Sequence, residues 1–179
     1  MIRLFAGLEF PDELSGRIAA LAFGLPGARW VAARNLHLTL RFIGEVSEAA
    51  AEDIHTELAS VPFDPFTLIL AGFGLFGDRH RAHTLWLGVE RSEALSRLAA
   101  KVEQAVVRAG QPAEPRKFSP HVTLARLRDS PPARLQDFIS AAPGLRANVA
   151  ADHFCLFQSL LGRGGAEYHV LERYPLVHI

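Results

Sequence analysis

Alternating apolar and polar positions predict two strands that carry the same short motif. The order His-aliphatic-Thr-Leu occurs at His37 and again at His121, about half a chain apart. Side chains two residues apart in a strand point to the same face. His37 therefore shares a face with Thr39, and His121 shares one with Thr123, while the aliphatic neighbours point into the core. The pattern predicts an imidazole beside a hydroxyl, twice, on a rigid element.

The same periodicities predict the remaining elements. Besides the motif strands at 36–43 and 118–127, we expect strands at 2–9, 30–31, 66–70, 85–89, 148–160 and 166–174, the last two joined by a hairpin turn at 162–165. Capping residues and apolar spacing predict helices from Pro11 through Leu25, Ser47 through Leu58, Ser92 through Ala109 and Leu135 through Ala141. The polar stretch 74–83 is expected to be a solvated hairpin connection, with a ligand-binding loop as the alternative.

The order of these elements predicts an α+β fold. Each half of the chain contains a helix, a motif strand and further strands, and no low-complexity linker divides the halves. We therefore expect two pseudo-symmetric lobes within a single bilobal domain that spans residues 1–179.

Composition narrows the class of protein. Hydrophobic residues make up 49% of the 179 residues and charged residues 21%, which indicates a globular chain rather than a disordered one. The 19 basic residues balance the 19 acidic residues. A neutral chain is a poor candidate for holding long duplexes through phosphates alone, but a small RNA end can bind in a locally basic cleft.

The chain shows none of the usual marks of export, membrane insertion or zinc binding. Its single cysteine, Cys155, has no disulfide partner and no Cys/His cluster in the sequence, so we expect a buried thiol. The N-terminus lacks the pattern of a signal peptide, and no run approaches the ~18 apolar residues of a membrane span. We expect a cytoplasmic protein without membrane contact.

The two motifs resemble those of the 2H phosphoesterase superfamily, which is named for two His-x-Thr-x motifs. Within it, the sequence is most similar to the bacterial and archaeal RNA 2′,3′-cyclic phosphodiesterases, also called 2′-5′ RNA ligases. The similarity extends over nearly the whole chain. It rests on the strings at 3–8, 29–31, 35–45, 85–89, 120–126 and 164–168.

The resemblance implies that two lobes of antiparallel sheet, with helices outside, face each other across a central cleft. Each lobe would contribute one catalytic histidine, His37 or His121. Opening a 2′,3′-cyclic phosphate requires a proton removed from water and another delivered to the departing ribose oxygen, which two imidazoles can do near neutral pH without a metal. The resemblance assigns water activation to His121 and protonation of O3′ to His37. The residues alone leave this order open.

Phosphate contacts are expected from both motifs. The Thr39 and Thr123 hydroxyls can donate to the phosphoryl oxygens, and the resemblance adds Arg126 as the cationic contact. Strict alternation would turn Arg126 away from Thr123, so its role requires a bulge or strand end. Arg41 shares the face of His37 by alternation and is a weaker candidate.

Base recognition is expected to use an aromatic face, since stacking serves any base. The candidates for stacking are Phe10, Phe42 and Phe157. The other histidines are expected to be structural or solvated: His55, His80, His83, His153, His169 and His178.

The leading interpretation is a monomeric, metal-independent phosphodiesterase that needs no cofactor and acts on RNA 2′,3′-cyclic phosphate ends or small nucleotides. By microscopic reversibility the same site could join a 2′-phosphate-type end to a 5′-hydroxyl end. Three alternatives remain. They are a relative that cleaves 2′-5′ oligoadenylate or a cyclic nucleotide, a non-catalytic RNA-end binder, and a metallohydrolase. Two intact motifs argue against a mere binder, and the lack of a carboxylate-rich cluster argues against the last.

Overall fold

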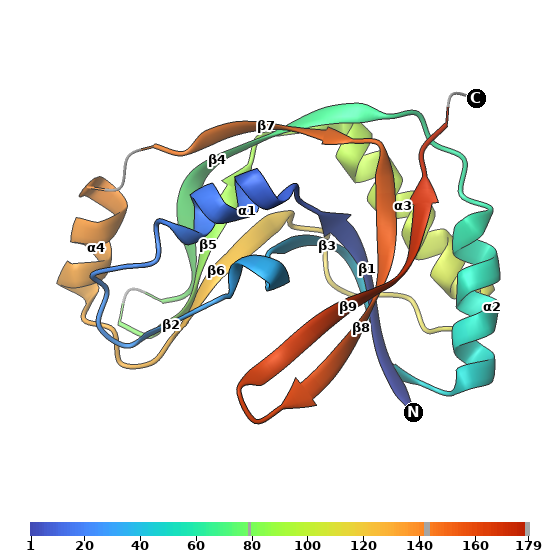
Figure 1. Ribbon diagram of the computed structural model, residues 1–179, viewed down its shortest axis with the longest axis horizontal. Coiled ribbons are helices and arrows are strands. Elements are labelled where there is room, and N and C mark those ends of the chain that lie inside the picture. The colour runs from blue at the N-terminus through green and yellow to red at the C-terminus, as the bar shows by residue number, and fades with distance from the viewer. Residues whose placement is uncertain (79, 142–143, 178–179) are drawn as a thin grey trace.

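The computed structural model describes residues 1–78, 80–141 and 144–177, which form two sheets and flanking helices (Figure 1). The strands are Ile2–Glu9 (β1), Ala28–Trp30 (β2), His37–Val46 (β3), Phe66–Gly77 (β4), Ala82–Val89 (β5), His121–Leu127 (β6), Arg146–Ala151 (β7), His153–Gly162 (β8) and Gly165–Pro175 (β9). The helices are Asp12–Ala19 (α1), Glu48–Ala59 (α2), Glu93–Arg108 (α3), Pro132–Ala141 (α4) and the 3-10 turn Ala33–Asn35 (η1).

Each sheet contains one motif strand. The four-stranded sheet has the order β3-β1-β8-β9 and the five-stranded sheet the order β2-β6-β5-β4-β7, with antiparallel pairing throughout. In Figure 1, α2 and α3 lie side by side at one end of the molecule and α4 lies at the other. The predicted α+β class with two antiparallel sheets is confirmed.

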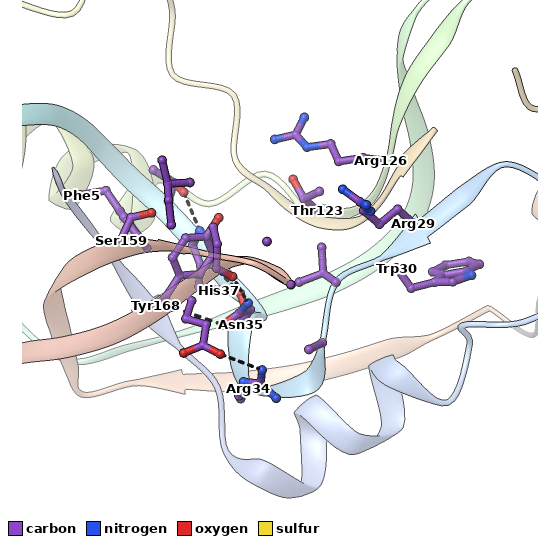
Figure 2. Close-up of a pocket in the computed structure, with 18 of the residues that line it drawn as sticks. Phe5, Arg29, Trp30, Arg34, Asn35, His37, Thr123, Arg126, Ser159 and Tyr168 are labelled. Atoms are coloured by element: carbon purple, nitrogen blue, oxygen red, sulfur yellow. Dashed lines mark hydrogen bonds and ion pairs between the residues drawn. The ribbon is translucent and has the colours of Figure 1, made fainter. Parts of the chain in front are cut away.

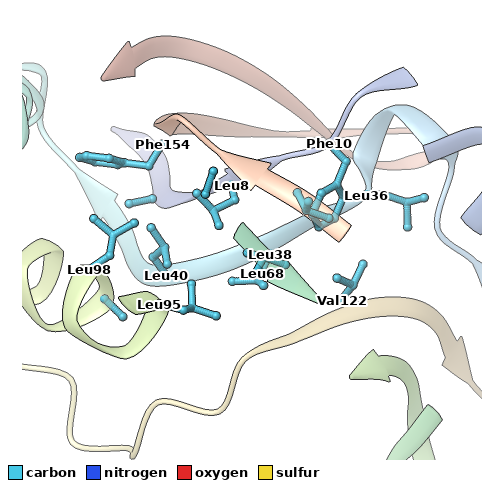
Figure 3. Packing of buried hydrophobic residues seen from close by; sticks show 14 of the residues in the cluster. Leu8, Phe10, Leu36, Leu38, Leu40, Leu68, Leu95, Leu98, Val122 and Phe154 are labelled. Carbon is cyan, nitrogen blue, oxygen red and sulfur yellow. The ribbon is translucent and has the colours of Figure 1, made fainter. Parts of the chain in front are cut away.

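The apolar faces of both sheets share one hydrophobic core (Figure 3). Leu38 of β3 and Val122 of β6 are fully buried in it, as are Leu95 and Leu98 of α3. Burying one such side chain contributes roughly 1.5–3 kcal/mol. The aliphatic half of each motif therefore anchors its strand, which leaves the histidine and threonine on the opposite face.

Two helices begin where the sequence predicted. The Ser47 hydroxyl accepts from the amide of Ala50 at 3.2 Å, and the Ser92 hydroxyl accepts from the amide of Leu95 at 3.2 Å. Each cap satisfies an amide that the first turn of a helix leaves without a partner.

The first helix is shorter than predicted. It ends at Ala19 rather than continuing to Leu25, although Leu25 is still buried. Gly24 and Gly27 have φ values of 75° and 76°, which are incompatible with a continuing helix. The apolar spacing there reflects a loop that packs on the core.

The strand predicted at 66–70 continues to Gly77, so the predicted loop at 74–83 was too long. The pairing of β4 with β5 shifts between Leu70 and Phe73, where Gly72 has φ 78°. This bulge lets the strand continue past a glycine that would otherwise end it.

Among the described residues, no helix is long and apolar enough to cross a membrane.

Candidate functional site

The motif strand β6 contains a β-bulge directly after its threonine. Thr123 pairs with Trp86 and Ala125 with Leu85, so Leu124 is an extra residue. Leu124 and Ala125 are both buried, and Arg126 returns to the open face of Thr123. The bulge that a phosphate contact from Arg126 requires is therefore present.

The motif strand β3 contains the corresponding bulge. Thr39 pairs with Gly7 and Arg41 with Ala6, so Leu40 is the extra residue. The bulge reverses the alternation, which turns Arg41 to the buried side and Phe42 to the open side.

The expectation that Arg41 shares the face of His37 is therefore wrong. Arg41 is only 7% exposed. It forms an ion pair with Glu103, lies 3.5 Å from Glu114 and donates to the carbonyl of Pro112 at 2.6 Å. Arg41 is a structural residue that ties β3 to α3 and to the connection after it.

Residues from both sheets line one cavity of about 580 Å³. In Figure 2, Thr123, Arg126 and Arg29 lie on one side of it, and Phe5, His37, Asn35 and Tyr168 lie on the other. The cavity residues that could act on a ligand are both motif pairs, His37 with Thr39 and His121 with Thr123, and the side chains Arg3, Arg29, Arg34, Arg126, Phe42, Ser159, Glu167 and Tyr168. Two motifs that are far apart in sequence thus face the same space.

The His37 imidazole has a fixed tautomer. Its Nδ1 lies 2.7 Å from the carbonyl oxygen of Asn35, which can only accept, so Nδ1 carries the proton. Its Nε2 lies 3.1 Å from the Thr39 hydroxyl. In the neutral imidazole, Nε2 is therefore the basic nitrogen, and it lies beside the motif's hydroxyl.

Aromatic rings surround His37. Their centroids lie 4.7 Å from it for Phe5, 5.9 Å for Phe157 and 5.0 Å for Tyr168. Burial lowers the pKa of His37; the hydrogen bond to Asn35 opposes this, and the charge of His121 adds to it. This pocket favours neutral His37.

The His121 imidazole has the same backbone contact in a different setting. Its Nδ1 donates to the carbonyl of Ser119 at 2.8 Å, again two residues earlier. Its ring stands perpendicular to Phe76, with centroids 4.7 Å apart, and Trp86 lies behind at 6.3 Å. Trp86 lies flat over Gly74, where a Cβ would come within 2.1 Å of the indole, so this wall requires a glycine.

Arg126 is held by a residue that the sequence did not indicate. Its Nη1 donates to the Thr84 hydroxyl at 2.8 Å, and Thr84 is only 1% exposed. Among the described residues, four arginines and a single glutamate line the cavity, so its lining is basic although the chain is neutral. Such a cavity favours an anionic ligand.

Of the three aromatic candidates, the structure places only Phe42 in the cavity. Phe42 is 40% exposed, and the Arg3 guanidinium lies 5.3 Å from its ring centroid. Phe10 is buried in the main core, and Phe157 is 5% exposed and stacks on Phe5. Their faces are covered by protein, so the stacking assignment of Phe10 and Phe157 is wrong, and Phe157 instead supports His37.

Three side chains that could bind a metal ion lie together in the structure although Glu9 is distant from the other two in sequence. Glu9, His153 and Cys155 place ligand atoms within 4.8 Å of one another. Arg173 already donates to both oxygens of Glu9, at 2.5 and 3.1 Å, and lowers the pKa of that carboxyl. Burial raises the pKa of Cys155 to about 12, in agreement with the predicted buried thiol.

The other histidines that the structure describes lie outside the cavity lining. His55 Nδ1 contacts the Tyr174 hydroxyl at 3.0 Å, and His83 Nδ1 contacts Thr84 at 3.0 Å. His80 and His169 are exposed. His178 lies outside the described residues.

Known proteins are similar to this chain in sequence and in architecture. The model of the 2′-5′ RNA ligase superfamily matches residues 10–163. The RNA 2′,3′-cyclic phosphodiesterase of Aeropyrum pernix is 36% identical over 164 residues, which cover 87% of this chain and 93% of the relative. The enzyme of the same name from Thermotoga maritima is 34% identical, with 95% and 93% covered.

Solved structures agree with this relationship. The crystal structure of Escherichia coli LigT complexed with 3′-AMP has a TM-score of 0.79 and 31% identity, with 99% of both chains covered. A further crystal structure of a phosphoesterase has a TM-score of 0.82 at 31% identity and the same coverage. The fold and the paired motifs define the class of 2H phosphoesterases. Within that class, the chain belongs to the 2′-5′ RNA ligase superfamily.

Proposed function

We propose that this protein hydrolyses RNA 2′,3′-cyclic phosphate ends to 2′-phosphate ends. The observation that carries the proposal is the paired site. His37 and His121 come from different sheets, line one arginine-rich cavity, and each uses Nδ1 on a carbonyl two residues earlier. Each imidazole therefore keeps Nε2 for proton exchange. The names of the relatives, RNA 2′,3′-cyclic phosphodiesterase, support the same substrate.

The reaction needs one base and one acid. His121 accepts a proton from water as the water oxygen bonds to phosphorus. The bond from phosphorus to O3′ then breaks, and O3′ takes a proton from His37. The product keeps its phosphate on the 2′ oxygen and has a free 3′ hydroxyl. With a 5′ hydroxyl in place of water, the same steps would join RNA ends through a 2′-5′ linkage, and their reverse would cleave that linkage to a cyclic phosphate and a 5′ hydroxyl.

The lowered pKa of His37 must be reconciled with its role as the acid. Burial by the protein favours neutral His37. A cyclic phosphate brings a negative charge next to the ring, and a neighbouring opposite charge favours the charged imidazolium. Substrate binding would thus protonate His37 at the moment when the acid is needed. This assignment of acid and base is a prediction.

The remaining cavity residues bind the phosphate and the base. The Thr39 and Thr123 hydroxyls and the Arg126 guanidinium would hold the phosphoryl oxygens as charge develops on them. The exposed face of Phe42 would stack on the base of the terminal nucleotide. The lining offers one carboxylate, Glu167, which pairs with Arg34 at 3.4 Å. This donor set suits an anion rather than a divalent metal.

A direct test uses an RNA that ends in a 2′,3′-cyclic phosphate, incubated in excess chelator. We expect hydrolysis at the same rate with and without chelator, and a 2′-phosphate product distinguished from the 3′-phosphate isomer by chromatography. A 2′-5′ oligoadenylate in a parallel reaction tests the alternative substrate. Activity lost to the chelator and restored by a divalent cation would favour the metallohydrolase.

We also propose that the protein acts in the cytoplasm as a monomer, with residues 1–179 as one functional unit. Both motif strands of one chain line the same cavity, so catalysis needs no second copy. Light scattering after size exclusion, at the protein concentration used for the assay, tests the oligomeric state.

A further inference from the structure

Asn35 of η1 connects the start of β3 to β9. Its backbone carbonyl accepts from His37 Nδ1 at 2.7 Å. Its side-chain Nδ2 donates to the carbonyl of Ala166 at 2.8 Å, and its Oδ1 accepts from the amide of Tyr168 at 3.3 Å. The amide group thus pairs with β9 as a neighbouring strand would. Figure 2 shows Asn35, His37 and Tyr168 together at one wall of the cavity.

The sheet order makes this contact informative. In the four-stranded sheet, β3 and β9 are the two outer strands, with β1 and β8 between them. Nevertheless the Tyr168 ring of β9 stands perpendicular to the His37 ring of β3, with centroids 5.0 Å apart. The sheet therefore curls until side chains of its two outer strands meet over the concave face, where η1, directly before β3, also contacts β9. Phe5 and Phe157 of the inner strands fill the space beneath.

We propose that Asn35 is a positioning residue that closes this sheet edge to edge and thereby holds His37 in a water-poor pocket. The kinetic part of this proposal rests on the proposed function. Asn35 touches no reacting atom through its side chain. It acts through β9, whose Tyr168 covers the imidazole, and through its own carbonyl, which sets the tautomer.

A second contact spans the same gap but contributes less. Arg34 lies 3.4 Å from Glu167, and both side chains are largely exposed, at 72% and 54%. An exposed ion pair of this kind contributes little, because water screens it. The two hydrogen bonds of Asn35 are partly buried and replace backbone pairing. The amide is therefore the main link between the two edges.

The charged and titratable groups near His37 are the same in the wild type and in Asn35→Ala, so the two proteins differ in how far water reaches the imidazole. His121 faces it from β6 and the Tyr168 phenol from β9. Arg34 of η1 and Glu167 of β9 are the chain neighbours of Asn35 and Tyr168, which contact the ring. Glu9 is its register partner on β1, and Arg173 occupies that carboxylate. Replacing Asn35 by alanine alters none of these charges. A change in the titration of His37 then reports how well the pocket is closed.

The test compares Asn35→Ala with Asn35→Gln and with the matched control Asn148→Ala, which removes an exposed asparagine of β7. The His37 resonance is identified from its loss in His37→Gln and followed by NMR against pH. We expect the pKa of His37 to rise toward its ordinary value in Asn35→Ala, and to rise partly in Asn35→Gln, which keeps the amide on a longer arm. Asn148→Ala should titrate as the wild type does.

Kinetics supply the second measurement. In Asn35→Ala we expect kcat to fall roughly 10-fold or more, because misplacing a catalytic group by about 1 Å can cost as much as 100-fold. The limb of the pH profile set by His37 should move to higher pH. A loss of activity with an unchanged His37 titration would overturn the proposal and leave Asn35 a merely structural residue. An unchanged titration in a fully active variant would overturn it as well.

The NMR arm needs no substrate, so the two proposals can fail separately. If the wild type does not open cyclic-phosphate RNA, the proposed function fails, while the His37 titration still decides the role of Asn35. If Asn35→Ala does not fold, the titration of Asn35→Gln decides. A shift toward the ordinary pKa supports the edge-to-edge closure, and no shift overturns it.

Discussion

The two motif strands are alike up to the bulge and differ directly after it. On β6 the bulge exposes Arg126 and buries Ala125, whereas on β3 it exposes Phe42 and buries Arg41. One backbone irregularity, used twice, thus presents a cation to the cavity from one lobe and an aromatic face from the other. The likeness of the lobes lies in the backbone, and their division of labour lies in the residues that follow each bulge.

The two histidines also differ in their surroundings. His37 lies among Phe5, Phe157 and Tyr168, and burial lowers its pKa. His121 rests against Phe76, with Trp86 behind. The surroundings of His37 thus shift its pKa although its motif is the same as that of His121.

The largest expected effect comes from removing either histidine. His37→Ala and His121→Ala should each lower kcat by roughly 10²–10⁴-fold, the usual contribution of a general acid or base. The double variant should be scarcely worse, because groups that act as one unit are not additive. Steady-state rates on cyclic-phosphate RNA measure this. Independent, multiplying losses would mean that the two lobes do not serve one reaction.

A substrate with an activated leaving group separates the two roles. Such a leaving group needs no proton, so it should restore much of the rate of the variant that lacks the acid. We expect rescue of His37→Ala and none of His121→Ala. Rescue of His121→Ala alone would reverse the assignment.

Substitutions of the two exposed residues after the bulges should affect different kinetic parameters. Arg126→Ala should lower kcat/KM by about 10²–10³-fold, because it removes a preorganised charge from the phosphoryl group. Phe42→Ala should weaken nucleotide binding by about 1–3 kcal/mol per stacked base, mainly through KM. An abasic ribose 2′,3′-cyclic phosphate is the control. On this substrate Phe42→Ala should no longer change KM, whereas Arg126→Ala should still lower kcat/KM. If both substitutions lowered kcat/KM on it equally, the division of labour between the two residues would be contradicted.

The sequence was sufficient to predict the parts of this comparison that depend on local pattern. Alternation placed His37 with Thr39 and His121 with Thr123, and the caps at Ser47 and Ser92 are where the sequence put them. A bulge was required for Arg126 and is present.

Other features depend on partners that are distant in sequence. The bulge at Leu40 follows from pairing with β1, and it reversed the predicted face of Arg41. The burial of Phe157 and the cover of His37 by Tyr168 depend on how β8 and β9 curl over β1. Periodicity along one strand contains no information about which strand lies beside it, so these features could not be predicted.

The buried residue after the first bulge should matter for stability rather than catalysis. Arg41→Met leaves Glu103 and Glu114 without their shared cation. Breaking a buried ion pair from one side costs roughly 3–5 kcal/mol. The two carboxylates are partly exposed, at 28% and 22%, so we expect about 2–3 kcal/mol.

Urea unfolding of Arg41→Met measures this loss, with Arg134→Met, an exposed arginine of α4, as the control. The kcat of the folded variant should stay within about 2-fold of the wild type, since Arg41 does not line the cavity. Adding Glu103→Gln should recover part of the stability. A large fall in kcat with little change in stability would return Arg41 to the site.

The smallest expected effect is the pH dependence of stability that comes from His37. Its pKa in the folded protein lies below the ordinary value of 6.5 because burial favours the neutral ring. Between the folded value and 6.5, the unfolded chain therefore binds more protons than the folded one, and the free energy of unfolding rises with pH in that window. The contribution of His37 is fully present above pH 6.5 and is lost as the pH falls toward the folded value. Wild type and His37→Gln, unfolded in urea at pH 8 and at pH 5.5, give the comparison. Subtracting the two variants cancels every other group, and the wild type should lose more stability on acidification than His37→Gln. Equal losses would mean that the aromatic pocket does not disfavour the charged ring, and the two histidines would then differ less than their surroundings indicate.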